Sequence, residues 1–344
     1  DSNPIAFSMV CTGFPGFLDG FPGRTSASDY DGNRMFFREA FQEFRHLPDE
    51  FSVHLFGGED AATPAEDNPH HLNYLTNPPY NLPGEISTLS SLDLLVFGDT
   101  ALDNFYEVVE LPETNHAADV LKSHRFYGGM GANTAVTANN LGLSTGLVSV
   151  IGTDAEDYRN YMSGQGIKLY LKGVFGDTTK SLFFKNNGHQ ISFFYKGVGD
   201  KIDEINPEKE FTNLAKKAKA VYLARTYLGM HKRVVKKYGD SFIVWNPGYG
   251  VFRLKEISKE FMQVLRKTDV FVVNEHELKH LQKIGFSLDF KKKPKFFIQT
   301  RGSRGCSVQS KNTQVQLKTY ETKVVDSSGA GDAFNAGFLA GHLR

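Results

Sequence analysis

Short apolar runs alternate with helical patterns along most of the chain, and this alternation limits the folds that the chain can adopt. Buried-strand patterns recur as LDLLVFGD (92–99), STGLVSVIG (144–152), AKAVYLA (218–224), SFIVWN (241–246), TDVFVVN (268–274) and KFFIQT (295–300). Helical patterns such as NTAVTANNLG (133–142) separate them. Repeated strand–helix units predict an α/β fold, with a mostly parallel central sheet and helices on both faces.

A second pattern, in which apolar and polar residues alternate with period two, is inserted into the first. SLFFKNNGHQISFFYKG (181–197) is predicted to form a hairpin around Asn187-Gly188, because this dipeptide favours a two-residue turn between strands. NFYEVVELP (104–112) and ADVLKSHRFY (118–127) are its expected companions. Such strands would have to lie off the main sheet, so we expect a small β-sheet lid with strands near 104–127 and 178–198.

Charge divides the chain into two modules. Residues 1–90 contain 13 Asp and Glu against four arginines and no lysine, a net charge of −9. The whole chain has 39 Lys and Arg against 39 Asp and Glu, so residues 91–344 carry a net charge of +9. The join, NPPYNLPGEISTLSS (77–91), is typical of a linker. We therefore expect an acidic, aromatic-rich N-terminal extension over 1–90 and a second domain over 91–344.

The extension contains one amphipathic helical pattern, in which Phe37, Phe41 and Phe44 share a face. Because the extension and the second domain have opposite charges, we expect this face to dock on that domain or on a basic partner. The whole chain is formally neutral, so no overall electrostatic field attracts nucleic acid or an anionic membrane. No apolar run is long enough to span a membrane.

Cysteine usage bears on the compartment. Cys11 and Cys306 are too few for a disulfide framework or a metal set. Two isolated thiols indicate a reducing compartment, so we expect a cytoplasmic protein and leave an organelle open.

The residues DSSGAGDAF (326–334) combine the features of an anion-binding site. Gly329 and Gly331 let the backbone turn so that successive N–H groups point at one spot, and the helix that begins there adds its partial positive charge. This predicts an anion hole for a phosphoryl group. Asp332 would repel a bound phosphate, but it suits a base that takes a proton from an attacking hydroxyl. A dinucleotide-binding turn and a purely structural glycine turn are the alternatives for this motif alone.

Other motifs place polar residues and glycines after predicted strands. GDTALD (98–103) leaves Asp103 at a strand end, and YGGMGANTA (127–135) places Asn133 where it can bond a polyol. NEHEL (274–278) puts Asn274 and Glu277 one helical turn apart, where they could hold Mg²⁺ through water. TRGSRG (300–305) is a glycine-rich turn, and no Walker sequence is present.

In this order, GDTALD, GGMGANTA, NEHE, TRGSRG and DSSGAGD resemble the motifs of the ribokinase-like (PfkB) carbohydrate kinase family, over residues 93–344. The resemblance implies ATP-dependent phosphorylation of a sugar or nucleoside hydroxyl, with Mg²⁺ and, in many relatives, a monovalent cation such as K⁺. Asp332 resembles the catalytic base. The other implied roles are the anion hole for Gly329, Ala330 and Gly331, acceptor binding for Asp103, Gly129 and Asn133, nucleotide binding for Thr300, Gly302 and Gly305, Mg²⁺ for Asn274 and Glu277, and the monovalent cation for Asp326.

The chain also departs from the family pattern. Met130 replaces the lysine that ribokinases carry in GGKG, which weakens a prediction of ribose specificity. The family continues some tens of residues past the GAGD helix, so we expect the given chain to stop early. The alternative function is a kinase-derived pseudoenzyme that acts as a scaffold or binding subunit of a larger assembly. A homodimer through the lid is left open.

Overall fold

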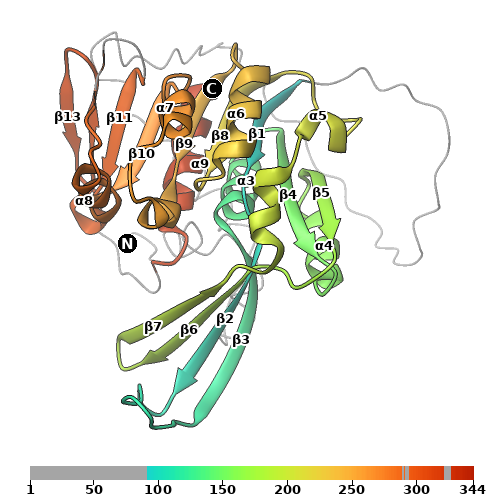
Figure 1. Cartoon of the computed structure of the whole chain (residues 1–344), viewed down its shortest axis with the longest axis vertical. Coiled ribbons are helices and arrows are strands. Elements are labelled where there is room, and N and C mark those ends of the chain that lie inside the picture. Colours follow the sequence, from blue (N-terminus) through green and yellow to red (C-terminus); the bar gives the residue numbers. More distant parts are fainter. Residues whose placement is uncertain (1–90, 289, 291–293, 321–326) are drawn as a thin grey trace, which may run out of the picture.

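The computed structural model describes residues 91–288, 290, 294–320 and 327–344 (Figure 1). The acidic extension with its Phe37, Phe41 and Phe44 pattern lies outside these residues, as does Asp326. Docking of the extension and the monovalent-cation role of Asp326 therefore stay predictions.

The main sheet has nine strands among the described residues, in the order β13-β12-β11-β10-β9-β8-β1-β4-β5. Pairing is parallel from β5 to β11, and antiparallel from β11 through β12 to β13. The alternation of strand and helix patterns thus correctly predicted a mostly parallel sheet. The strands are β1 (Leu92–Phe97), β4 (Thr145–Gly152), β5 (Lys168–Val174), β8 (Ala218–Ala224), β9 (Phe242–Asn246), β10 (Val270–Asn274), β11 (Phe296–Thr300), β12 (Cys306–Gln309) and β13 (Gln314–Leu317).

Helices cover both faces of this sheet, because the strands bury apolar side chains on each side. One apolar core includes α3 (Met130–Asn140), α4 (Glu156–Ser163) and α9 (Ala330–Leu343). The core on the other face includes α6 (Leu228–Lys237), α7 (Lys259–Leu265) and α8 (Glu275–Lys283). Shorter helical segments are η4 (Gly197–Glu204), α5 (Pro207–Glu210), η5 (Gly248–Arg253) and η6 (Gly302–Arg304). Within the described ranges, no helix is long and apolar enough to cross a membrane.

The direction in which the strands are added reverses beside β1. The chain passes from β1 outward to β4 and β5, and then returns to β8 on the other side of β1 before it continues to β9, β10 and β11. In open α/β sheets, ligands bind at the carboxyl ends of the strands where such a reversal occurs. The carboxyl ends of β1 and β8 are therefore the expected place of the functional site.

A second, smaller sheet has the order β3-β2-β6-β7. Its strands are β2 (Ala101–Val108), β3 (Val120–Gly128), β6 (Lys180–Asn186) and β7 (His189–Tyr195). β2 and β6 are parallel, and the other pairs are antiparallel. The turn between β6 and β7 has φ of 45° at Asn187 and 82° at Gly188, the positive values that a two-residue hairpin favours. Figure 1 shows this sheet projecting from the main one, as expected of a lid.

Candidate active site

The first turns of two helices meet where the strand order reverses. Asn133, in the first turn of α3, donates a hydrogen bond of 2.9 Å from Nδ2 to Oδ2 of Asp332, in the first turn of α9. α3 comes close to β1 because two glycines are in contact there. A Cβ on Gly131 would lie 2.7 Å from the Cα atom of Gly98. Two residues that the sequence suggested separately are thus brought together.

Gly129 precedes α3 with a φ of 103°, which favours glycine. A Cβ at this position would lie 2.6 Å from the carbonyl oxygen of Asp99. The predicted acceptor residue Gly129 therefore allows the backbone to pass beside the end of β1.

Asp332 is buried, with 8% of the residue exposed. Burial raises its pKa to about 7, and the charges of Asp99 and Asp103 add to that rise. The hydrogen bond from Asn133 and the charge of Arg225 oppose it. A carboxylate with a pKa near 7 is suited to accept a proton at neutral pH.

No described residue fills the space beside Gly331, in the first turn of α9. Gly329 caps the helix with a φ of 75°, and its carbonyl oxygen accepts a hydrogen bond of 2.9 Å from the N–H group of Ala333. A Cβ added to Gly331 would meet no heavy atom of the described part of the chain within 4 Å. The first N–H groups of a helix lack acceptors within the helix, so an anion has room beside them.

Asp103 lies in β2, close to the point where the lid leaves the body. A Cβ on Gly128 would overlap the Asp103 carboxylate, so the missing side chain at Gly128 makes room for this acid. Burial raises the pKa of Asp103 to about 6, while a hydrogen bond with Ser181 opposes the rise. The negative charge of Asp99 also raises the pKa of Asp103, and the positive charge of Arg225 lowers it. Asp103 and Asp332 thus share the same charged neighbours.

Sequence reasoning missed Asp99 and Arg225. Oδ2 of Asp99 lies 2.6 Å from Nε of Arg225, and the two side chains are 2% and 17% exposed. The backbone N–H of Gly131 donates to Oδ1 of Asp99 at 3.4 Å. Asp99 lies in the GDTALD motif, where it could have been noticed. The only signal for Arg225 is its position directly after the apolar run AKAVYLA.

Asn274 and Glu277 are brought together as a capping box at the start of α8. Oδ1 of Asn274 accepts a hydrogen bond from the N–H of Glu277, and Oε2 of Glu277 accepts one from the N–H of Asn274, both at 2.9 Å. Burial raises the pKa of Glu277. Within the described ranges, no group of three or more His, Cys, Asp or Glu residues is arranged to hold a metal ion.

The three residues expected on the nucleotide side lie at the β11–β12 turn. Thr300 ends β11 and pairs in register with Asn274 of β10, so these two motifs share one edge of the sheet. Gly302 and Gly305 have φ values of 57° and 83°. In the strand order, β10 and β9 separate this turn from β8.

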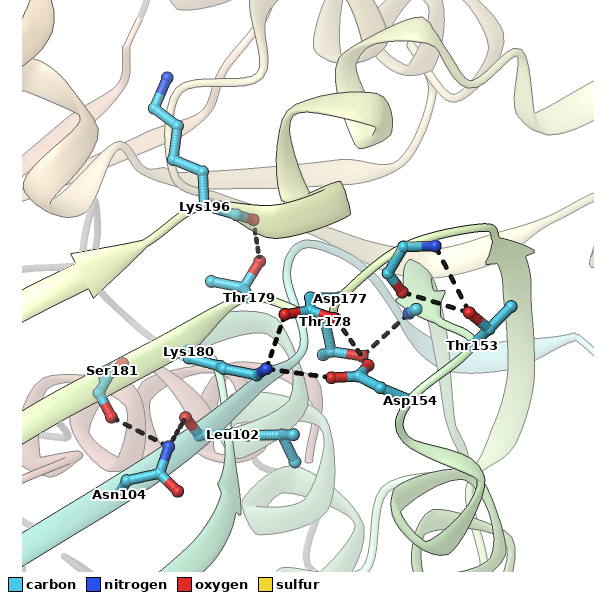
Figure 2. A network of polar contacts seen from close by, with 12 residues as sticks. Leu102, Asn104, Thr153, Asp154, Asp177, Thr178, Thr179, Lys180, Ser181 and Lys196 are labelled. Atoms are coloured by element: carbon cyan, nitrogen blue, oxygen red, sulfur yellow. Dashed lines mark hydrogen bonds and ion pairs between the residues drawn. The ribbon is translucent and has the colours of Figure 1, made fainter.

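A polar network joins the lid to the main sheet (Figure 2). Nζ of Lys180, the first residue of β6, lies 2.9 Å from Oδ2 of Asp177 and 3.3 Å from Oδ2 of Asp154. Oδ1 of Asp154 accepts a hydrogen bond of 2.7 Å from the N–H of Thr178. The hydroxyl of Thr178 accepts one of 2.9 Å from the N–H of Gly152, the last residue of β4. The base of β6 is therefore tied to the end of β4.

Comparison with known proteins gives consistent matches. The family model for pfkB family carbohydrate kinases matches residues 91–344. A nucleoside kinase from Methanocaldococcus jannaschii is 29% identical over 257 residues, which is 72% of this chain and 82% of that protein. One from Methanothermobacter thermautotrophicus is 27% identical over 263 residues, covering 73% and 83%. The crystal structure of the M. jannaschii nucleoside kinase matches with a TM-score of 0.65 at 27% identity, over 74% of this chain and 85% of that one.

Proposed function

The chain belongs to the pfkB family of carbohydrate kinases, and we propose that its acceptor is a nucleoside. Family membership and the kinase relatives indicate ATP-dependent phosphorylation of a sugar or nucleoside hydroxyl. The relatives are named for kinase activity, so they favour an enzyme over the scaffold alternative.

The observation that carries the proposal is a row of aromatic rings on the lid face that also bears Asp103. Side chains alternate between the faces of a sheet, so the face of each residue follows from the strand register. Four phenylalanines share the face of Asp103 by this register, and their successive ring centroids lie 4.6 to 6.2 Å apart. They are Phe126 in β3, Phe105 in β2, Phe183 in β6 and Phe194 in β7.

The row continues from the lid onto the body. The ring centroid of Phe194 lies 5.1 Å from that of Tyr249 in η5. Because Phe194 contacts Tyr249, the lid face that bears Asp103 is directed toward the main sheet, and the opposite face of the lid is directed away from it. The acceptor is therefore proposed to bind between an aromatic surface and the carboxylates of Asp103 and Asp332.

A nucleoside matches both parts of this surface. The carboxylate of Asp103 can accept hydrogen bonds from ribose hydroxyls, and the aromatic rings can stack on a planar base. Stacking of one base on an aromatic side chain contributes about 1–3 kcal/mol. A free sugar would have no planar group to place against these rings. The nucleoside kinases among the relatives support the same acceptor class.

In the proposed reaction, the Asp332 carboxylate takes the proton of the acceptor hydroxyl while that oxygen attacks the γ-phosphorus of ATP. The bond between the γ-phosphorus and the β–γ bridging oxygen breaks, and ADP leaves with that oxygen. Asp332 then releases its proton to solvent. The first turn of α9, with Gly329, Ala330 and Gly331, is proposed to stabilise the charge on the transferring phosphoryl group.

Glu277 and Asn274 are proposed to hold Mg²⁺ through water. Oε2 of Glu277 is used by the capping box, and Oε1 is the atom that we assign to the hydrated ion. A single carboxylate fits Mg²⁺, which keeps several waters and takes its other ligands from phosphates. When bound, the ion would neutralise phosphate charge. Thr300, Gly302 and Gly305 are proposed for the nucleotide side of the same edge.

The acceptor class can be tested with two adjacent residues of β7. Phe194 and Phe193 are 42% and 56% exposed and lie on opposite faces of the lid. We expect the wild type to prefer a nucleoside to free ribose in kcat/KM. Phe194→Leu should raise the nucleoside KM roughly 5-fold or more, while Phe193→Leu should not. Preference for ribose, or equal effects of the two substitutions, would contradict a nucleoside acceptor.

A further inference from the structure

Three carboxylates and one guanidinium meet at the site described above. Asp103 and Asp332 have proposed roles in the reaction, whereas Asp99 and Arg225 have none so far. The charge of Asp99 acts on both Asp103 and Asp332, and Arg225 acts on both in the opposite sense. A pair that is buried at this point, next to the reacting groups, calls for an explanation beyond fold stability.

Resting on the proposed function, we propose that Arg225 is a positioning residue whose charge, fixed against Asp99, keeps Asp332 available as a carboxylate beside Asp103. The pair would then act on the reaction through Asp332, without itself contacting the reacting atoms. Asp99 would hold the guanidinium in place, and the guanidinium would offset the mutual repulsion of the carboxylates.

The backbone of Arg225 is fixed in a conformation that few residues adopt. Its φ of 64° lies in the left-handed region, which is unfavourable for a residue other than glycine. The N–H of Arg225 donates to the carbonyl oxygen of Asn246 at 2.9 Å. Its own carbonyl oxygen accepts a hydrogen bond of 2.8 Å from Nε1 of Trp245, a fully buried side chain. These contacts hold the backbone from which the Arg225 side chain extends.

The side chain is fixed as well. Nε of Arg225 is 2.6 Å from Oδ2 of Asp99, although neither atom has hydrogen-bond geometry with any described partner. The contact is therefore an ion pair in a buried setting, where charge interactions are screened weakly. Asp99 is in turn tied to the start of α3 through the N–H of Gly131. The charge of Arg225 is held next to the helix that carries Asn133.

Among the described residues, the other groups that act on Asp332 carry no positive charge. α3 contributes the neutral amide of Asn133, and β8 contributes Tyr222, whose pKa is raised well above its usual range by burial. The ends of β1 and β2 contribute Asp99 and Asp103, which are both acids. Among the described residues, Arg225 is the cation that acts on Asp332. Without it, burial and like charges would both favour the protonated acid.

This role predicts opposite effects for the two members of the pair. Activity requires ionised Asp332, so the acidic limb of the kcat profile follows the pKa of that residue. Arg225→Met removes a positive neighbour and should move the limb to higher pH, on the order of one pH unit. Asp99→Asn removes a negative neighbour and should move it to lower pH. The double variant should lie between the two single variants, close to the wild type.

The experiment measures kcat against pH for the wild type, both single variants, the double variant and Arg225→Lys, which keeps the charge. In Arg225→Lys, the acidic limb of the kcat profile should lie at the same pH as in the wild type, even if the maximal kcat falls. The double variant leaves neither charge unpaired, so it covers the case in which a single variant does not fold. Shifts in the same direction, or a lower kcat with no shift, would overturn the proposal and leave the pair a structural role.

A second measurement does not depend on activity. The side-chain carboxyl carbon of Asp332 can be titrated by NMR in protein labelled with ¹³C-aspartate, and its signal identified by its loss in Asp332→Asn. The same opposite shifts are expected in Arg225→Met and Asp99→Asn. If no nucleoside is phosphorylated but these shifts appear, the acceptor proposal fails and the role of Arg225 stands. If nucleosides are phosphorylated and no shift appears, only the role of Arg225 fails.

Discussion

The side-chain amide of Asn133 donates a hydrogen bond of 2.9 Å to Asp332, and so joins residues 199 positions apart. Each lies in the first turn of a helix, and the two helices pack in the same apolar core. The amide favours the ionised form of Asp332, while burial favours the protonated form. The balance sets the pKa of this acid at about 7, where a general base is most useful.

Burial of Asp332 should lower stability at neutral pH. Its pKa is about 7 in the folded protein and about 3.9 in an unfolded chain, so the folded protein binds the extra proton between these values. The contribution of Asp332 to the free energy of unfolding therefore falls as pH rises through that window. Asp332→Asn should be more stable than the wild type. The difference in the free energy of unfolding should be about 2 kcal/mol larger at pH 8 than at pH 5.5. Urea unfolding measures this; an equal difference at both pH values would contradict it.

Asp103→Ala should weaken acceptor binding far more than ATP binding. A carboxylate can accept hydrogen bonds from two hydroxyls, each worth roughly 1.5–3 kcal/mol. Calorimetry with a nucleoside and, separately, with ATP measures both affinities. Unchanged nucleoside affinity in this variant would show that Asp103 does not bind the acceptor.

Gly331 and Gly131 occupy the first turns of α9 and α3, but they should respond to alanine in opposite ways. A Cβ on Gly131 would lie 2.7 Å from backbone atoms of Gly98, so Gly131→Ala should destabilise the fold by about 1–3 kcal/mol. A Cβ on Gly331 meets no atom of the described residues within 4 Å, so Gly331→Ala should keep or raise the melting temperature. It should still lower kcat, because the methyl group occupies the proposed phosphoryl position. Normal turnover in Gly331→Ala would argue against the anion hole.

Lys180 should affect the lid more than the overall stability. Its side chain is 30% exposed, so its ion pairs contribute only about 0.2–1 kcal/mol to folding. They connect β6 to Asp154, however, so Lys180→Met should loosen the lid and increase ATP hydrolysis by water relative to transfer. Lys196→Met is a matched control, since the Lys196 side chain pairs with nearby Asp200 instead. Equal ratios of hydrolysis to transfer in the two variants would count against this role.

The sheet and the lid could be predicted because their signals are local. Apolar runs separated by helical patterns indicate parallel strands, and Asn187-Gly188 marks the hairpin within a few residues. The aromatic row beside Asp103 could not be predicted in this way. It depends on the parallel pairing of β2 with β6, which brings Phe105 opposite Phe183 from a distant part of the chain.

Part of the candidate site could be proposed from the sequence for the same reason. Asp332 follows two glycines at a helix start, a pattern that indicates its chemistry without any tertiary information. Arg225 is a single arginine after a strand, and most such residues are solvated. Its proposed role depends on β8 lying beside β1, which places it against Asp99. The spacing of Asn274 and Glu277 also fits a capping box, which is how the structure uses them.

The central claim, that Asp332 is the base of nucleoside phosphorylation, is tested most directly by the turnover of Asp332→Asn. A positioned base contributes about 10²- to 10⁴-fold, so ATP-dependent formation of nucleoside monophosphate should fall by at least about 100-fold. Nucleoside affinity, measured by calorimetry, should stay within a few-fold of the wild type. A variant that binds the nucleoside and keeps more than about a tenth of the wild-type kcat would contradict the claim.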